Sequence, residues 1–211
     1  MTGEARKIRL VMELRQAGVT ETRVLAAMER VPRELFVPEP FRDQAYANIA
    51  LPIGAGQTLS QPAIVARMTQ ALALGERMKV LEVGTGSGYQ TAVLSKLCRR
   101  VYTMEQHRHL LQAAEKRFRQ LGLHNVTSRT GDGHTGWPEQ APFDRIIVTA
   151  AAEEIPAGLA DQLAVGGLMI VPVGPRHGEQ HLTRVVRTEE GLDVHSIGTV
   201  RFVALARGRS S

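Results

Sequence analysis

Residues 80–89 read VLEVGTGSGY and join a short apolar run to the start of a helical pattern. Gly84, Gly86 and Gly88 are spaced G-x-G-x-G, and glycines let a backbone approach a ligand that a Cβ would block. Dinucleotide-binding turns instead carry G-x-G-x-x-G and place a pyrophosphate at the helix N-terminus. Glu82 precedes the glycines, and its carboxylate would repel a pyrophosphate but suit a cofactor with an ammonium group. These four positions therefore favour S-adenosylmethionine over NAD as the bound cofactor.

Two further carboxylates follow the next strands expected along the chain. Glu105 lies about 20 residues after the glycine turn, where an acidic side chain accepts hydrogen bonds from ribose hydroxyls. Asp132 stands between Gly131 and Gly133, where its carboxylate would reach an adenine amino group and the Gly133 N–H would face the ring. Taken alone, Glu105 also fits a helix start favoured by the helix dipole, and Asp132 also fits a plain turn. With the glycine turn, they predict the ribose and adenine ends of the cofactor site.

Residues 51–62, LPIGAGQTLSQP, are the second unusual segment. Two glycines are followed by the uncharged hydrogen-bonding side chains of Gln57, Thr58 and Ser60. Such groups suit a loop that folds over a substrate. An ordinary helix start is an equal alternative, because a serine shortly before a proline-led helix is a standard N-terminal cap.

These residues need a framework that brings them together, and the hydrophobic periodicity predicts one. Before residue 75 the apolar spacing predicts helices and a proline-punctuated stretch. From residue 79 short apolar strands alternate with helices, which predicts a parallel sheet covered on both faces. Strands are expected at 80–83, 100–104, 126–129, 143–149, 167–173, 182–188 and 198–206, and helices at 63–73, 90–97, 109–121 and 157–163.

The fold class predicted from this order is α/β. We expect a doubly wound, Rossmann-like methyltransferase sheet, mostly parallel, with an antiparallel edge formed by the last two strands. An N-terminal helical extension precedes it. Residues 1–75 are expected to form a helical segment and a substrate loop packed on the core, and residues 76–211 the S-adenosylmethionine-binding core.

The composition indicates the class of protein, its partners and its cellular compartment. Hydrophobic residues make up 43% and charged residues 22%, which is typical of a globular chain. The net charge of +5 raises nucleic acid as a partner, but the basic residues are dispersed, so none is expected. Cys98 is the one cysteine, which excludes an internal disulfide and a cysteine-based zinc site. The first 18 residues lack the apolar core of a signal peptide, and no run approaches the roughly 20 apolar residues of a membrane helix, so we expect a cytoplasmic monomer.

Longer stretches of the chain resemble the protein-L-isoaspartate O-methyltransferase family of the bacterial type. The resemblance covers about residues 31–208, and its loop motif is more specific than its glycine motif. The matching stretches are VPRELFV at 31–37, the AY…ALPIG.GQTLSQP loop at 45–62, VARMTQAL at 65–72, VLEVGTGSGYQTAVL at 80–94, GDG..GWP at 131–138, FDRIIVTAA at 143–151 and VRFV.L at 200–205.

The resemblance implies a reaction, in which a methyl group passes from S-adenosylmethionine to the α-carboxylate of L-isoaspartyl residues in damaged proteins. The ester then closes to a succinimide, which hydrolyses to aspartate. Ser60 matches the active-site serine of the family, and Gln57 and Thr58 match loop residues near cofactor and substrate. Ile53 and the strand from Val203 to Leu205 correspond to walls that hold the peptide. The remaining family contacts to the cofactor fall on Glu82, Gly84, Glu105, Asp132 and Gly133.

Departures from the family pattern are small. The family commonly has an acidic residue where Ala47-Asn48 stand, a tryptophan at His134 and a proline at Ala204. These differences are expected to affect the affinity for peptide and not the class of reaction. A nucleic-acid methyltransferase is the first rival, but residues 149–152, TAAA, replace the Asp/Asn-Pro-Pro-aromatic motif of amino-group methylators. A non-catalytic binding module is the second rival. No metal is expected, because an acceptor carboxylate is already ionised at neutral pH.

Overall fold

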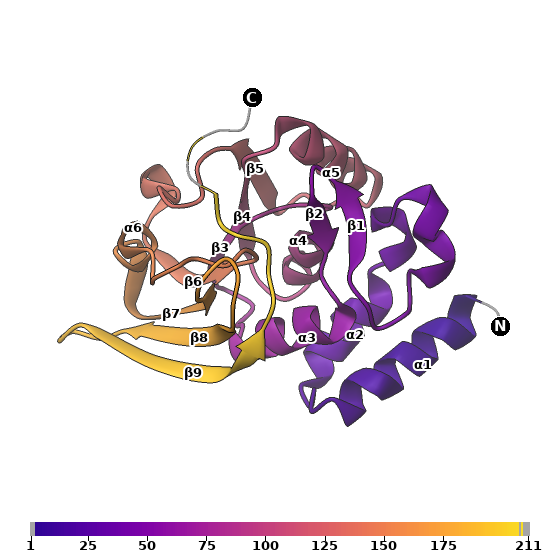
Figure 1. Cartoon of the computed structure of the whole chain (residues 1–211), viewed down its shortest axis with the longest axis horizontal. Coiled ribbons are helices and arrows are strands. Elements are labelled where there is room, and N and C mark those ends of the chain that lie inside the picture. The colour runs from indigo at the N-terminus through magenta and orange to yellow at the C-terminus, as the bar shows by residue number, and fades with distance from the viewer. Residues whose placement is uncertain (1–2, 207, 209–211) are drawn as a thin grey trace.

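The computed structural model describes residues 3–206 and 208 and is built around one large sheet with helices on its faces (Figure 1). The sheet has seven strands in the order β5-β4-β3-β6-β7-β8-β9. The strands are β3 Lys79–Val83, β4 Arg100–Glu105, β5 Val126–Thr130, β6 Phe143–Val148, β7 Leu163–Val173, β8 Gln180–Arg187 and β9 Leu192–Val200. The strands from β5 to β7 pair in parallel, and β8 and β9 add antiparallel to β7. The predicted doubly wound sheet with an antiparallel edge is therefore confirmed.

Helices come mainly before and between the first strands. The helices are α1 Gly3–Gln16, α2 Thr22–Arg30, α3 Pro62–Ala71, α4 Tyr89–Ser95, α5 Arg108–Gln120 and α6 Ala157–Ala160, with short 3₁₀ helices η1 Arg33–Phe36, η2 Glu39–Gln44 and η3 Pro138–Gln140. Within the described part of the chain, none of the helices has the length and apolar character needed to cross a membrane. The predicted N-terminal helical extension is present as α1 and α2.

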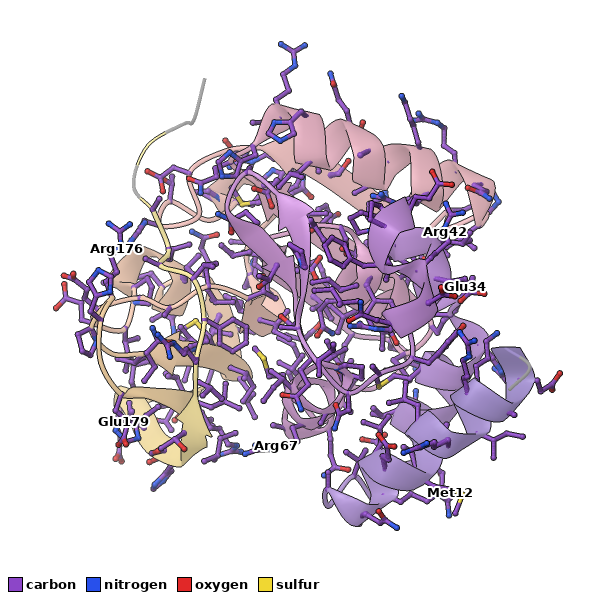
Figure 2. The ribbon with its side chains drawn as sticks, turned by 45° about the vertical axis from the view of Figure 1, so that its right-hand side comes forward. Met12, Glu34, Arg42, Arg67, Arg176 and Glu179 are labelled. Carbon is purple, nitrogen blue, oxygen red and sulfur yellow. The ribbon has the colours of Figure 1, made fainter. Side chains whose placement is uncertain are left out.

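Two clusters of buried side chains cover the two faces of the sheet. Successive strand residues point to opposite faces, so Val80 belongs to one cluster and Leu81 to the other. The larger cluster holds apolar residues of α1 to α5, whereas the smaller one holds Trp137 and the buried residues of α6. Met12 of α1 is exposed to solvent, and Figure 2 shows it at the lower right of the molecule. Glu34 and Arg42, on η1 and η2, lie above it in that view.

Residues 51–59 fold as a hairpin rather than as the irregular loop expected from the sequence. β1 Leu51–Gly54 pairs antiparallel with β2 Gln57–Leu59. The connection has positive φ at Gly54, Ala55 and Gly56, of which only Ala55 carries the steric penalty of a Cβ there. The hairpin stands beside the carboxyl end of the sheet and carries the polar segment singled out in the sequence (Figure 1).

The last predicted strand was placed too far along the chain. The edge strand is β9 at Leu192–Val200, and residues 201–206 contain one isolated bridge, between Ala204 and Ala151. β9 was missed because an edge strand with mostly exposed residues lacks a buried apolar stripe. The helix predicted at 157–163 is also shorter, since α6 ends at Ala160 and Leu163 already pairs with Phe143 in the sheet.

The chain reverses its winding direction at β3. From β3 it proceeds outward through β4 and β5, and it then returns to β6 on the other side of β3. Ligands of such sheets bind beyond the carboxyl ends of the strands at this reversal. The fold therefore directs attention to the residues that follow β3, β4, β5 and β6.

Candidate active site

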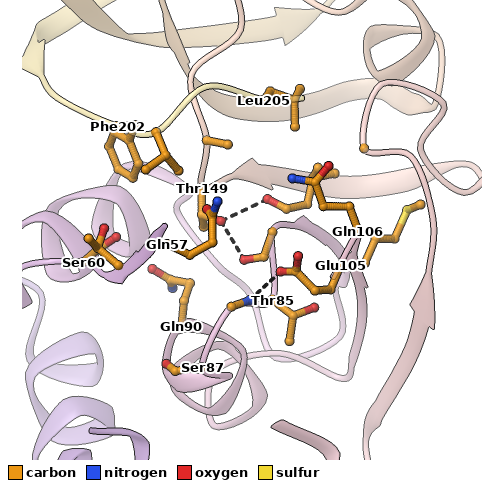
Figure 3. Close-up of a pocket in the computed structure, with 18 of the residues that line it drawn as sticks. Gln57, Ser60, Thr85, Ser87, Gln90, Glu105, Gln106, Thr149, Phe202 and Leu205 are labelled. Atoms are coloured by element: carbon orange, nitrogen blue, oxygen red, sulfur yellow. Dashed lines mark hydrogen bonds between the residues drawn. The ribbon is translucent and has the colours of Figure 1, made fainter. Parts of the chain in front are cut away.

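A cavity opens at the carboxyl edge of the sheet, where four strand ends and the hairpin meet (Figure 3). Ser60, after the hairpin, and Glu105, at the end of β4, lie on opposite sides of it. The lining also includes Gln57, Thr58, Gln90, Met104, Gln106 and Thr149, the turn 83–87, Gly131, Gly133 and the segment 202–206. Regions distant in sequence thus contribute to one site.

The glycine turn follows β3 and is fixed by the ends of its neighbouring strands. Gly84 has φ +99°, and a Cβ there would lie 2.2 Å from the Thr149 hydroxyl oxygen. That hydroxyl, at the end of β6, donates hydrogen bonds to the carbonyl oxygens of Val83 at 3.1 Å and Gly84 at 2.6 Å. The glycine is therefore required both for backbone conformation and for contact with β6. Figure 3 shows Thr149 at the centre of the site.

The other two glycines of the turn have different neighbours. A Cβ at Gly86 would meet Ile53 of the hairpin at 3.3 Å. Gly86 lines the cavity, whereas Gly88 is absent from the lining and a Cβ there would lie 2.6 Å from the Phe118 ring. Gly88 thus permits α4 to pack on α5, while Ile53 packs over the turn itself.

Glu105 is buried and borders the cavity from the end of β4. Its Oε2 accepts a hydrogen bond from the Gly86 N–H at 2.8 Å, and its Oε1 accepts one from the His107 N–H at 3.0 Å. The carboxylate therefore joins the glycine turn to β4 and presents oxygens at the cavity. Its place agrees with the predicted ribose contact, which the structure does not test.

Glu82 takes a different position from the one expected. Its side chain is 0% exposed and lies outside the cavity lining, behind the glycine turn. Oε2 accepts hydrogen bonds from the hydroxyls of Thr91 and Thr103, whereas the buried Oε1 has no partner among the described residues. Loss of solvation raises the pKa of this carboxyl to about 8. A direct contact with a cofactor ammonium group stays a prediction, and the present arrangement does not supply it.

Gly133 and Asp132 follow β5, and they border two different hollows of the surface. Gly133 lines the cavity, and a Cβ there would lie 2.5 Å from Val83 Cγ1. Asp132 borders the adjacent groove, where its carboxylate accepts hydrogen bonds from the N–H groups of Gly208 at 2.8 Å and His134 at 2.9 Å. Desolvation opposes ionisation of Asp132, but these bonds and the His134 ring hold its pKa below the usual range. Its predicted adenine contact is likewise untested.

The hairpin and the C-terminal segment close the cavity from two sides. Gln57, Thr58 and Ser60 all line it, and the Ser60 hydroxyl makes no hydrogen bond with another described residue. Val203 and Leu205 line it from the chain that crosses the sheet edge. Backbone hydrogen bonds of 2.8 and 2.7 Å tie that chain to Ala151, which explains how it stays in place without being a full strand.

Several lining residues were missed at the sequence level. Three of them line the cavity because they directly or closely follow a strand, namely Thr149 after β6, Gln106 after β4 and Phe202 after β9. The rule that ligands lie beyond strand ends could have found Thr149 and Gln106. Gln90 comes from the first turn of α4, and no sequence signal distinguished it. Among the described residues, no three His, Cys, Asp or Glu side chains gather as a metal site would require.

Comparisons with known proteins agree with this architecture. A family model described as protein-L-isoaspartate(D-aspartate) O-methyltransferase matches residues 5–210. The protein-L-isoaspartate O-methyltransferase of Paramagnetospirillum magneticum is 61% identical over 206 residues, which cover 97% of this chain and 96% of the relative. The enzyme of that name from Rhodospirillum rubrum is 62% identical over 210 residues, covering 99% of this chain and 96% of the relative.

Solved structures that match this chain in fold include enzymes of the same name. A protein-L-isoaspartate O-methyltransferase structure matches with a TM-score of 0.86 and 29% identity, covering 96% of this chain and 66% of the solved one. A Plasmodium falciparum chain classed with these enzymes, in complex with S-adenosyl-L-homocysteine, matches in fold with a TM-score of 0.81 at 24% identity, covering 95% and 98%. Fold and site thus define a Rossmann-like, S-adenosylmethionine-dependent methyltransferase. The chain belongs to the protein-L-isoaspartate(D-aspartate) O-methyltransferase family, whose model and relatives span nearly its whole length.

Proposed function

We propose that this chain methylates the α-carboxylate of L-isoaspartyl residues in damaged proteins, with S-adenosylmethionine as donor and S-adenosylhomocysteine as product. The observation that supports this most directly is the shared cavity. The hairpin residues Gln57, Thr58 and Ser60 and the glycine turn line the same space. An acceptor held by the hairpin would therefore lie next to a cofactor held by the turn.

The residues around the turn fit the chemistry of the cofactor. Glu105 offers a carboxylate for ribose hydroxyls, and Met104, Val83 and Leu205 offer apolar surface for a planar ring. S-adenosylmethionine supplies an electrophilic methyl group on a sulfonium. We assign Gly84, Gly86, Gly133 and Asp132 to the same binding function, and Gly88 and Glu82 to the support of the turn from behind.

The reaction requires alignment more than acid–base chemistry. A carboxylate with an ordinary pKa of about 3.9 is already ionised at neutral pH, so no side chain has to remove a proton. We assign the Ser60 hydroxyl to donate a hydrogen bond to the acceptor carboxylate and orient it. Well-oriented reactants can gain on the order of 7–11 kcal/mol over free ones. Phe202, Val203 and Leu205 would exclude water as opposite charges approach.

Repair follows from the chemistry of the ester. The backbone amide nitrogen of the next residue attacks the ester carbonyl, methanol leaves and a succinimide forms. Water then opens the ring, and part of the product is normal aspartate. We further propose that the protein works as a cytoplasmic monomer on damaged proteins and peptides, without nucleic acid or membrane, as the dispersed charge and the absence of long apolar runs favour.

An assay with matched peptides tests this function. Two peptides identical except for one L-isoaspartyl or L-aspartyl residue are incubated with the protein and methyl-labelled S-adenosylmethionine. We expect label in the isoaspartyl peptide, with methanol released on standing, and none above background in the aspartyl peptide. Equal labelling of both peptides, or labelling of RNA with neither peptide labelled, would refute the proposal.

A further inference from the structure

Arg33 is a buried arginine of η1 that is bonded to the segments before and after the hairpin. Its side chain is 0% exposed. Nε donates a hydrogen bond to the Ala45 carbonyl oxygen at 2.8 Å, and Nη2 donates one to the Ser60 carbonyl oxygen at 3.0 Å. The guanidinium carbon also lies 4.7 Å from the centre of the Tyr89 ring. Arg33 thus contacts two backbone carbonyl groups and one aromatic ring, and it leaves the Ser60 hydroxyl free for the proposed reaction.

Of these three partners, Ser60 lines the cavity, whereas Ala45 and Tyr89 lie outside its lining. Ala45 lies six residues before β1 and Ser60 directly follows β2, so one guanidinium links the chain that enters the hairpin to the chain that leaves it. Tyr89 is the residue directly after Gly88, at the start of α4. Because the guanidinium is planar and its donors are fixed, it sets the spacing of the two carbonyls in a way that a flexible ammonium does not.

The charge of this arginine has no carboxylate partner within ion-pair distance among the described residues. Glu34, the nearest in sequence, accepts a hydrogen bond from the Tyr46 hydroxyl instead. Nη1 of Arg33 is buried without a hydrogen-bond partner. Burial of an unpaired charge is costly, and an apolar side chain of similar size would fill the space at lower cost. A requirement for these specific hydrogen bonds explains why a guanidinium is present.

A second arginine, Arg117, forms hydrogen bonds to both η1 and the glycine turn. Arg117 of α5 donates from Nε to the Leu35 carbonyl oxygen at 2.8 Å and from Nη1 to the Ser87 carbonyl oxygen at 3.1 Å. Leu35 belongs to η1 and Ser87 to the turn. η1 is thus connected on one side to the hairpin and on the other to the cofactor turn.

We propose that Arg33 is a positioning residue that holds the segments flanking the hairpin, and with them the Ser60 hydroxyl, at a fixed place relative to the glycine turn. This inference rests on the proposed role of Ser60. It assigns Arg33 no contact with substrate or cofactor. Its loss displaces the acceptor from the methyl donor while the donor remains bound.

The test compares Arg33→Lys with the parent enzyme. Lysine keeps a positive charge but loses the fork that bridges Ala45 and Ser60. Since a displacement near 1 Å can cost about 100-fold in rate, we expect kcat to fall roughly 10- to 100-fold. The Kd for S-adenosylhomocysteine, measured by calorimetry, should stay within about threefold of the parent. Arg33→Gln provides a second variant if Arg33→Lys does not fold.

Arg145→Lys is the matched control. Arg145 also joins separate segments through carbonyl oxygens, those of Leu72 at 2.6 Å, Ala73 at 3.3 Å and Asp144 at 2.7 Å, but at the amino end of β6, away from the cavity. We expect it to lower the unfolding temperature and leave kcat unchanged. A kcat loss in Arg145→Lys equal to that in Arg33→Lys, at equal loss of stability, would show that Arg33 acts through stability and overturn the inference.

A double-mutant cycle with Ser60→Ala separates this inference from the proposed function. If Arg33 acts through Ser60, Arg33→Lys should slow the Ser60→Ala enzyme by less than threefold. If instead the two losses multiply in full, Arg33 does not act through Ser60 and the inference fails while the reaction stands. If Ser60→Ala alone leaves kcat unchanged, the proposed role of Ser60 fails, and this inference fails with it.

Discussion

Two buried carboxylates near the glycine turn differ in what surrounds them. Both oxygens of Glu105 accept a backbone N–H, and the side chain borders the cavity. Glu82 accepts only from threonine hydroxyls and keeps one unpartnered oxygen. With its pKa raised to about 8 by desolvation, Glu82 is mainly a neutral acid at neutral pH. The sequence predicted that both carboxylates contact the cofactor, and it could not separate them, because burial and hydrogen-bond partners are set by tertiary packing.

The neutral state of Glu82 gives a pH-dependent prediction. The folded-state pKa is raised from 4.5 to about 8, so the unfolded chain binds fewer protons in this range and stability falls as pH rises from about 5 to 8. Glu82→Gln stays neutral at every pH and should lose this component. We expect the unfolding temperature of the variant, relative to the parent, to increase from pH 5 to pH 8 in circular dichroism melts. Exposed Glu76→Gln controls for the lost charge, and a flat difference for Glu82→Gln would show that Glu82 is ionised when folded.

At the scale of elements, the site depends on the turn between β3 and α4 fitting against the end of β6. The Thr149 hydroxyl that binds this turn occupies the space where a Gly84 side chain would project. The sequence predicted β3, the glycines and their cofactor. It could not predict Thr149, because parallel pairing of β3 with β6 joins residues 65 positions apart. The hairpin was missed as an element for a similar reason, since three- and four-residue strands leave little periodicity.

Gly84→Ala tests this fit. The backbone at φ +99° and the 2.2 Å approach to Thr149 Oγ1 both oppose a Cβ, and strain of this kind costs about 1–3 kcal/mol. We expect a lower unfolding temperature and at least tenfold weaker binding of S-adenosylhomocysteine by calorimetry. Gly84→Ala combined with Thr149→Ala should recover only the part due to the clash. Gly3→Ala, where a Cβ would meet nothing within 4 Å, is the control. Parental affinity in Gly84→Ala would mean that the turn is not part of the cofactor site.

At the scale of the whole molecule, the fold class and the parallel strands along the chain were predicted from the sequence more readily than the antiparallel edge. Alternating buried strands and helices give a strong signal, because a parallel sheet is apolar on both faces. β9 is mostly exposed and gives almost none. The proposed boundary between residues 1–75 and 76–211 stays a prediction. One buried cluster nevertheless contains Leu14 of α1, Phe36 of η1 and Ile170 of β7, so side chains from both parts pack together.

This shared cluster predicts that the N-terminal helices and the sheet unfold together. Trp137, the one tryptophan, lies in the other cluster, on the far face of the sheet from α1 to α5. Its fluorescence therefore reports the sheet, whereas far-ultraviolet circular dichroism is weighted toward helices. We expect urea unfolding curves from the two probes to coincide in midpoint and slope, as a two-state transition requires. Loss of helical signal at lower urea than the fluorescence change would contradict this, and would indicate that residues before 75 form a separately unfolding unit.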